Sequence, residues 1–341
     1  MKRMADAAFV SCGGVGGPQG RRREVVVSGK RVKTVDVHAH CAVPAAMALM
    51  GRKLETEALL MTDTRGRLQA MDAQGIDVEA LSINPYWYAA DRDVATELIR
   101  IQNETLAEIC AARPDRFVAF ASVALQHPDL AVEQLEQGVK RYGLRGAGLG
   151  GSVEGLELSD PRFHPFWAKA EQLGVLVFIH PQGTVELERT GRLAGNGLLT
   201  NTIGNPLETT IALSHLIFEG TLDRFPGLKI CGAHGGGYLP SYAARSNAVQ
   251  TTFPHRMTGA LKKRPTEYLR QLYFDSIVFT PEALRHLAAE AGPGQIVMGT
   301  DYPFPWTQTS VDHILGTPEL SEADKIAMLG GTAMTLLGIK S

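Results

Sequence analysis

The chain alternates between short apolar runs rich in β-branched residues and longer stretches whose apolar residues recur at helical spacing. Such a run predicts a buried strand, whereas a stretch such as 95–113 (ATELIRIQNETLAEICAAR) predicts an amphipathic helix. Strand-like runs lie at 34–40, 78–83, 117–124, 146–149, 175–180, 229–233, 273–278 and 295–300. Repeated strand and helix units predict a parallel sheet, and these eight runs predict an α/β fold of the (β/α)8 TIM-barrel type.

An open doubly wound sheet is the alternative architecture for the same alternation. Such a sheet normally carries a glycine-rich phosphate loop after its first strand, whereas the first run here ends in His38-Ala39-His40. We therefore favour the closed barrel, without a nucleotide loop. No obvious linker divides residues 31–341, which we interpret as one domain. Residues 1–30 contain a Gly cluster and three consecutive arginines, and they predict a flexible N-terminal arm.

The amino-acid composition and net charge indicate which kinds of partner the protein binds. The 341 residues are 44% hydrophobic and 21% charged, which is typical of a globular protein. The 34 basic and 36 acidic residues give a formal net charge of -2, so no overall positive field attracts nucleic acid or anionic lipid. The four cysteines form no CxxC pair, and neither a signal peptide nor a membrane-spanning run is visible. We expect a cytoplasmic protein without a nucleic-acid or membrane partner.

Candidate chemistry lies where the predicted strands end. His38 and His40 are two residues apart, so in an extended chain both side chains point to the same face. His180 is the last residue of a further run, and His234 and Asp301 come directly after two others. Each residue alone has a structural interpretation, as a core histidine or a turn-forming aspartate. Together they supply the nitrogen and oxygen ligands that a divalent cation such as Zn²⁺ or Mn²⁺ requires.

Several longer motifs extend these observations over nearly the whole chain after residue 31. They are VDVHAH at 35–40, MDAQGIDVEAL at 71–81, HP at 180–181, NPLETT at 205–210, FPGLKICGAHGGG at 225–237, PTEYL at 265–269, YFDSIVFTPEAL at 273–284 and MGTDYPFP at 298–305. In these motifs the chain resembles the metal-dependent amidohydrolase superfamily. The resemblance is to the amidohydrolase-2 branch, which includes aminocarboxymuconate-semialdehyde decarboxylase and γ-resorcylate decarboxylase.

The resemblance implies a (β/α)8 barrel that binds one divalent metal ion and needs no organic cofactor. The implied metal ligands are His38, His40, His180 and Asp301, and the implied catalytic histidine is His234, with Asp301 sharing its role. The affinity order of divalent ions favours Zn²⁺, while availability and the single carboxylate leave Mn²⁺ open.

The resemblance also implies a shared site between subunits. Arg245 lies eleven residues after His234, at the position of an arginine that reaches across a dimer interface to the substrate carboxylate. We therefore expect a homodimer or a higher homo-oligomer. A second substrate arginine of that decarboxylase has no unambiguous match here, although Arg52 is nearby, and the segment after His180 lacks the tryptophans of that enzyme. The resemblance does not fix the substrate.

Two loops have alternative interpretations. The loop at 84–88 carries Tyr86 and Trp87, which either stack on a flat substrate ring or pack beneath a lid over the site. The stretch at 186–206 is rich in Gly and Asn, and it forms either this lid or an ordinary surface loop.

The predicted function is a nonoxidative, metal-dependent decarboxylation of a small aromatic or unsaturated carboxylic acid. The alternative is a hydrolase or hydratase of the same superfamily, such as a lactonase, because bound hydroxide can attack a carbonyl or an alkene. A noncatalytic carboxylate-binding protein is disfavoured, because four histidines and an aspartate gathered in one site would contribute little to stability.

Overall fold

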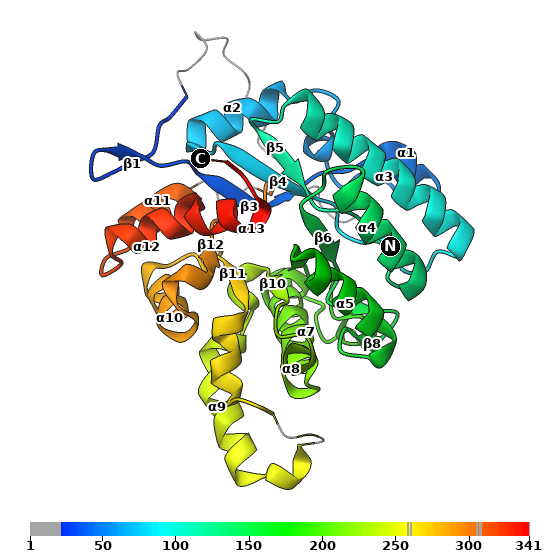
Figure 1. The fold of residues 1–341 in the computed structure, drawn as a ribbon, viewed down its shortest axis with the longest axis vertical. Coiled ribbons are helices and arrows are strands. Elements are labelled where there is room, and N and C mark those ends of the chain that lie inside the picture. The colour runs from blue at the N-terminus through cyan, green and yellow to red at the C-terminus, as the bar shows by residue number, and fades with distance from the viewer. Residues whose placement is uncertain (1–21, 258, 260, 305, 307–308, 341) are drawn as a thin grey trace.

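The computed structural model describes residues 22–257, 259, 261–304, 306 and 309–340. Within these residues, parallel strands form a central barrel that helices surround (Figure 1). The barrel strands are β3 (Val35–His40), β4 (Val78–Ser82), β5 (Phe117–Ala119), β6 (Gly146–Leu149), β9 (Leu176–Ile179), β10 (Lys229–Gly232), β11 (Tyr273–Asp275) and β12 (Ile296–Val297). Each of them lies inside one of the predicted apolar runs, so the predicted strand pattern is confirmed.

The barrel closes through two short junctions. One set of strands has the order β3-β4-β5 and the other has the order β12-β11-β10-β9-β6, with parallel pairing throughout. Parallel bridges between Ala39 and Tyr302 and between Ala121 and Ala147 join the two sets at both edges. The TIM-barrel prediction is therefore confirmed, and the open doubly wound alternative is wrong.

Helices and short hairpins occupy the connections between strands. The helices are α1 (Pro44–Ala48), α2 (Arg65–Gln74), α3 (Arg92–Ala112), α4 (Pro128–Lys140), α5 (His164–Leu173), α6 (Val185–Arg189), α7 (Asn205–Phe218), α8 (Thr221–Arg224), α9 (Leu239–Thr252), α10 (Pro281–Ala291), α11 (Ser310–Gly316), α12 (Glu322–Ile326) and α13 (Thr332–Leu337). The hairpin β7 (Ser152–Val153) and β8 (Leu156–Glu157) follows β6. Helix α9 projects from the body of the molecule (Figure 1). None of the described helices combines the length and hydrophobicity needed to cross a membrane.

Alternate strand residues build two apolar layers. One buried cluster takes every second residue of the strands, such as Val35 and Val37 of β3 and Leu176 and Phe178 of β9, and it includes residues of α13. The residues between them, such as Val177, belong to a larger cluster beneath the surrounding helices. This alternation is what a barrel filled by side chains and covered by helices requires.

The register of β3 shifts between Asp36 and Ala39. Because side chains alternate along a strand, such a shift changes which positions face inward. Val35 and Val37 can thus belong to the apolar cluster while His38 and His40, one position out of phase with them, meet at the end of the barrel.

The predicted N-terminal arm is only partly described. Residues 1–21 lie outside the described residues, whereas residues 22–31 contain the hairpin β1 (Val26–Val27) and β2 (Lys30–Arg31). Val25 and Val27 are buried in the core, and Arg22 and Arg31 both pair with Asp77. The boundary at residue 30 stays a prediction.

Candidate metal centre and active site

A cluster of imidazoles and one carboxylate lies at the carboxyl ends of the barrel strands. One ligand atom from each of His38, His180, His234 and Asp301 lies within 4.8 Å of the others. The sequence places these residues at the ends of β3, β9, β10 and β12, and barrel closure brings those ends together. The arrangement has the composition of a divalent metal site.

His40 lies beside this cluster. Its Nε2 atom is 3.0 Å from Nε2 of His38 and 2.9 Å from Oδ1 of Asp301. The same Asp301 oxygen is 3.1 Å from Nε2 of His38, while the other Asp301 oxygen is 3.7 Å from Nε2 of His234. All five residues singled out from the sequence are therefore brought together around Asp301. The division of His40 and His234 between metal ligand and catalytic group stays a prediction.

Asp275, which the strand-end pattern did not single out, holds two members of the cluster in place. Its Oδ2 atom is 2.7 Å from Nδ1 of His38 and accepts the backbone N–H of His234 at 2.8 Å, and its Oδ1 atom accepts the N–H of Gly235 at 2.9 Å. Asp275 is fully buried at the end of β11. A carboxylate that ends an otherwise apolar run was the available signal in the motif YFDSIVF.

Burial and the carboxylates set the protonation of the cluster. Burial opposes charge on His38, but Asp301 and Asp275 outweigh it and raise the pKa of His38 to about 10. Burial lowers the pKa of His40 to about 4 and holds the pKa of His180 well below its ordinary value. Burial opposes charge on Asp301 too, yet the neighbouring imidazoles hold the pKa of this carboxyl well below its ordinary value.

The donor atoms fit a divalent cation. The Asp301 carboxylate is ionised next to the neutral imidazoles of His40 and His180, which is the charge state that metal ligands adopt. His38, whose pKa is raised to about 10, must release its proton when an ion binds. The Nδ1 atoms of His180 and His234 are buried and have no hydrogen-bond partner among the described residues. Buried polar atoms are normally paired, so these nitrogens indicate a group that completes the site.

Two residues of the cluster have unusual backbone angles. His234 has φ +54° and Asp301 has φ +61°, which is the left-handed region that residues other than glycine rarely adopt. The turn after His234 is Gly235-Gly236-Gly237, and a Cβ atom at Gly237 would lie 2.1 Å from the carbonyl oxygen of Pro206. Left-handed residues cost free energy and cluster at functional sites, where the surrounding hydrogen bonds hold them.

A buried ion pair supports His40 from the side of helix α2. The Arg67 Nε atom donates to Oε2 of Glu79 at 2.5 Å, and Nη1 donates to the carbonyl oxygen of His40 at 2.8 Å. The guanidinium lies 4.5 Å above the ring of Tyr302, directly after Asp301. Arg67 and Glu79 are almost fully buried, so the pair links the ends of β3 and β12 inside the protein.

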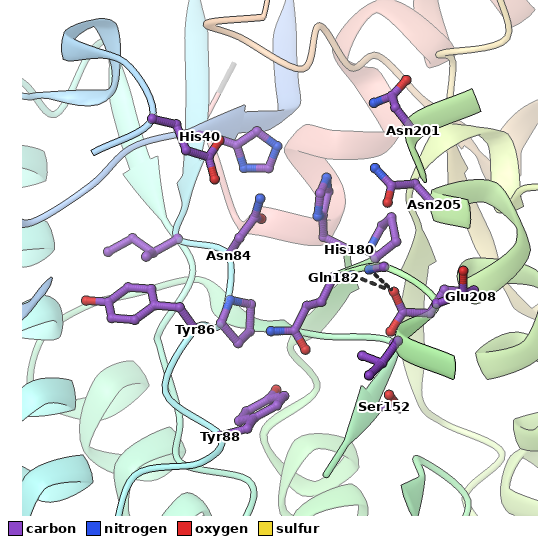
Figure 2. Close-up of a pocket in the computed structure, with 18 of the residues that line it drawn as sticks. His40, Asn84, Tyr86, Tyr88, Ser152, His180, Gln182, Asn201, Asn205 and Glu208 are labelled. Atoms are coloured by element: carbon purple, nitrogen blue, oxygen red, sulfur yellow. Dashed lines mark hydrogen bonds between the residues drawn. The ribbon is translucent and has the colours of Figure 1, made fainter. Parts of the chain in front are cut away.

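A cavity of about 1180 Å³ opens at this centre. His40, His180, His234 and Asp301 line it, and so do polar and aromatic side chains from the surrounding loops (Figure 2). Those labelled in Figure 2 are Asn84, Tyr86, Tyr88, Ser152, Gln182, Asn201, Asn205 and Glu208. The volume suits a small organic ligand.

The aromatic loop at 84–88 divides between the cavity and the core. Tyr86 lines the cavity, and its hydroxyl accepts a hydrogen bond from Nε2 of Gln102 at 3.0 Å. Trp87 does not line it: its side chain is fully buried, and Nε1 donates to the carbonyl oxygen of Val123 at 2.9 Å. The packing interpretation thus describes Trp87, because the indole N–H finds its partner in the core.

The two arginines considered for substrate binding lie in different places. Arg52 lines the cavity together with Lys53. Arg245 is exposed on helix α9 and lies outside the cavity of its own chain. The stretch at 186–206 contributes Glu186, Leu187, Asn201 and Asn205 to the cavity wall, as the lid interpretation requires.

Comparison with known proteins adds the following similarities. A family model described as amidohydrolase matches residues 35–339. The 2-amino-3-carboxymuconate-6-semialdehyde decarboxylase of Dictyostelium discoideum is 31% identical over 308 residues, which cover 89% of this chain and 85% of that protein.

Solved structures agree with the sequence comparisons. The fold is similar to that of 2,6-dihydroxybenzoate decarboxylase complexed with 2,6-dihydroxybenzoate, with a TM-score of 0.79, 29% identity, and coverage of 90% of this chain and 100% of the other. It is also similar to dihydroxybenzoic acid decarboxylase of Polaromonas sp. JS666 with bound manganese and the inhibitor 2-nitroresorcinol. That pair has a TM-score of 0.78 and 27% identity, covering 90% of this chain and 97% of the other.

Proposed function

The chain belongs to the amidohydrolase family, and from that premise we propose that it catalyses the nonoxidative, metal-dependent decarboxylation of a small aromatic or unsaturated carboxylic acid. The observation that carries the proposal is the cluster of His38, His40, His180, His234 and Asp301 in the cavity. The similarity to decarboxylases over about nine tenths of the chain supports the reaction class.

We propose that His38, His40, His180 and Asp301 hold the ion, which leaves His234 for proton transfer. A divalent cation bound there supplies positive charge that polarises a substrate oxygen and offsets developing negative charge. The manganese in the Polaromonas enzyme supports Mn²⁺, while the affinity order supports Zn²⁺. Metal analysis of the purified protein, followed by removal with a chelator and separate reconstitution with each ion, distinguishes them by restored activity and by the rise in melting temperature.

The protein must also deliver a proton. When the bond to the carboxylate carbon breaks, the electron pair stays on the substrate carbon, which then takes up a proton as CO₂ leaves. We assign this delivery to the His234 imidazole, because it lines the cavity beside Asp301 and histidine is the side chain that most often transfers protons in catalysis. Asp301, with one oxygen 3.7 Å from Nε2 of His234, assists by stabilising the protonated ring.

Substrate binding is assigned to three side chains. Arg52 and Tyr86 line the cavity, where a guanidinium can pair with a carboxylate and a phenol ring can contact a flat ring. Arg245 is assigned to the site of a second subunit, because it is exposed and lies outside the cavity of its own chain. This assignment requires at least a dimer.

The test is CO₂ release by the zinc-loaded or manganese-loaded protein from a panel of hydroxybenzoates, aminobenzoates and muconate-semialdehyde acids. We expect release from at least one acid, and a decrease of about 100-fold or more in His234→Ala, which keeps the other four residues of the cluster. If protein that contains metal releases no CO₂ from any acid of the panel, the proposal is contradicted. Proton release from lactones without gas would then identify the hydrolase.

A further inference from the structure

Glu208 of helix α7 is a buried carboxylate in the cavity wall. Its side chain is only 6% exposed, and its Oε2 atom accepts two consecutive backbone N–H groups, from Gln182 at 2.5 Å and from Gly183 at 2.6 Å (Figure 2). Hydrogen bonds to an ionised carboxylate are stronger than neutral ones. The loop that starts at His180 is therefore fixed to α7 two residues after the histidine.

These hydrogen bonds lie at the base of a long loop segment, residues 184–204, between β9 and α7. The segment at 184–204 leaves the barrel directly after Gly183 and returns directly before α7. Its two ends lie together, because a Cβ atom at Gly204 would be 3.2 Å from Oγ1 of Thr184. Since Thr184 and Asn201 line the cavity, the position of this wall depends on how its base is held.

Two glycines after β6, Gly150 and Gly151, leave space for the side chains of Gln182 and Glu208. A Cβ atom at Gly151 would lie 2.7 Å from Cγ of Glu208, and one at Gly150 would lie 2.2 Å from Oε1 of Gln182. Contacts below 3.0 Å require a shift of the neighbouring atoms, so each glycine leaves space for one of the two side chains. Glu208 and Gln182 thus pack side by side against the backbone of the same loop.

The Gln182 side-chain amide forms part of the cavity wall. The amide lies near Tyr88, because the same Cβ atom built at Gly150 would also lie 3.1 Å from Cε2 of Tyr88. No hydrogen bond joins this amide to another described side chain or backbone group, and Gln182 lines the same cavity as His180 (Figure 2). This exposed amide has unused donor and acceptor atoms, which suit recognition of a neutral polar substituent.

We propose that Glu208 is a positioning residue that holds the backbone at Gln182 and Gly183, at the base of the 184–204 segment. The side-chain amide that Gln182 thereby presents to the cavity binds a hydroxyl or amino substituent of the substrate. The substrate part of this inference rests on the proposed decarboxylase function. The positioning part rests only on the hydrogen bonds and close packing of Glu208. Burying a carboxylate is costly, and the two hydrogen bonds from the loop offset part of that cost.

The first experiment measures the positioning role without substrate. Hydrogen–deuterium exchange of the metal-loaded full chain at about pH 8 compares the wild type with Glu208→Gln and with Glu219→Gln at the other end of α7. We expect the amides of residues 182 and 183 to exchange about tenfold faster in Glu208→Gln and to be unchanged in Glu219→Gln. Equal exchange in the wild type and Glu208→Gln overturns the positioning role.

The second experiment measures the substrate contact. Glu208→Gln and Gln182→Ala should each raise KM about tenfold, with kcat changed less than about threefold and bound metal unchanged. The double variant should be no worse than the more severe single variant, because both changes remove one contact. A purely structural role for Glu208 would lower the melting temperature and leave KM unchanged.

The two experiments fail separately. An unchanged KM in Gln182→Ala overturns the substrate contact even if amide exchange behaves as expected. If the wild-type protein releases no CO₂ from any acid of the panel, the proposed function fails and the substrate contact fails with it. The exchange experiment then still decides whether Glu208 fixes the loop.

Discussion

At the scale of single residues, the centre depends on groups that are not themselves proposed metal ligands. Asp275 contacts Nδ1 of His38 and accepts the backbone N–H of His234, so one carboxylate orients two members of the cluster. A histidine that binds metal through one nitrogen commonly donates its other N–H to a carboxylate, which fixes the ring and its tautomer. Asp275 occupies that position relative to His38.

Replacement of Asp275 should therefore weaken metal binding. We expect Asp275→Asn to lower metal affinity and kcat/KM by about 10–100-fold, because the His38 ring loses its charged partner and the turn at His234 loses a strong acceptor. Titration with a competing chelator and steady-state kinetics measure the two effects. Asp63→Asn, at an exposed aspartate, is the control and should change neither quantity. Wild-type affinity in Asp275→Asn would contradict the orienting role.

The buried ion pair between Arg67 and Glu79 makes a prediction about stability. Arg67→Met leaves the Glu79 carboxylate buried without its partner, and such a change costs about 3–5 kcal/mol in the free energy of unfolding. Arg65→Met, in the same helix but exposed and paired with Asp63, should change the free energy of unfolding far less. Urea unfolding of both variants gives the comparison. Similar losses in the two variants would show that burial of the pair is unimportant.

At the scale of elements, helix α7 and the loop after β9 are coupled through Glu208. Burial raises the pKa of Glu208 to about 7, although the N–H groups of Gln182 and Gly183 lower it. The ordinary value of a glutamate is about 4.5, so between these two pH values the folded protein holds a proton that the unfolded chain has released. The contribution of Glu208 to stability is therefore greatest at low pH and is lost as the pH rises to about 7.

This pH dependence can be isolated by subtraction. The difference in the free energy of unfolding between the wild type and Glu208→Gln should change by roughly 2–3 kcal/mol between about pH 5 and about pH 8, with the wild type relatively less stable at the higher pH. Denaturant titrations of both metal-loaded proteins at the two pH values measure it. A difference that is constant with pH would place the pKa of Glu208 near its ordinary value.

At the scale of the whole molecule, the position of Arg245 makes a prediction about assembly. The residue is exposed on helix α9, which projects from the body of the molecule (Figure 1), and it does not line the cavity of its own chain. If Arg245 completes a neighbouring site, a mixed dimer of Arg245→Ala and His234→Ala contains one intact site. Mixing the two inactive variants after dissociation should restore about a quarter of wild-type activity, since half of the random dimers are mixed.

The control for this complementation is each variant dissociated and reassociated alone, which should stay inactive. Sedimentation of the mixture reports whether dimers form. An active wild-type monomer, or dimers of the two variants without restored activity, would exclude the role of Arg245 across an interface.

The sequence alone determined the barrel and the identity of the central cluster. The eight apolar runs predict strands, because a strand buried on both faces requires continuous apolar residues. The polar residue at the end of a strand can then be identified from its position in the sequence. His38, His40, His180, His234 and Asp301 could thus be chosen from strand ends before any distance was known. The resemblance to the family reinforced the same residues.

The tertiary structure alone decided which residues support that cluster. Asp275 contacts His38 from 237 positions away in the chain, and the partners of Glu208 and Arg67 likewise come from other elements. The division of the aromatic loop, with Tyr86 in the cavity and Trp87 in the core, was also undecided, because an irregular loop has no fixed alternation of side chains. The physical reason is the same in each case. Local periodicity fixes strands, whereas the pairing of buried polar groups depends on which distant atoms the closed barrel brings within hydrogen-bonding distance.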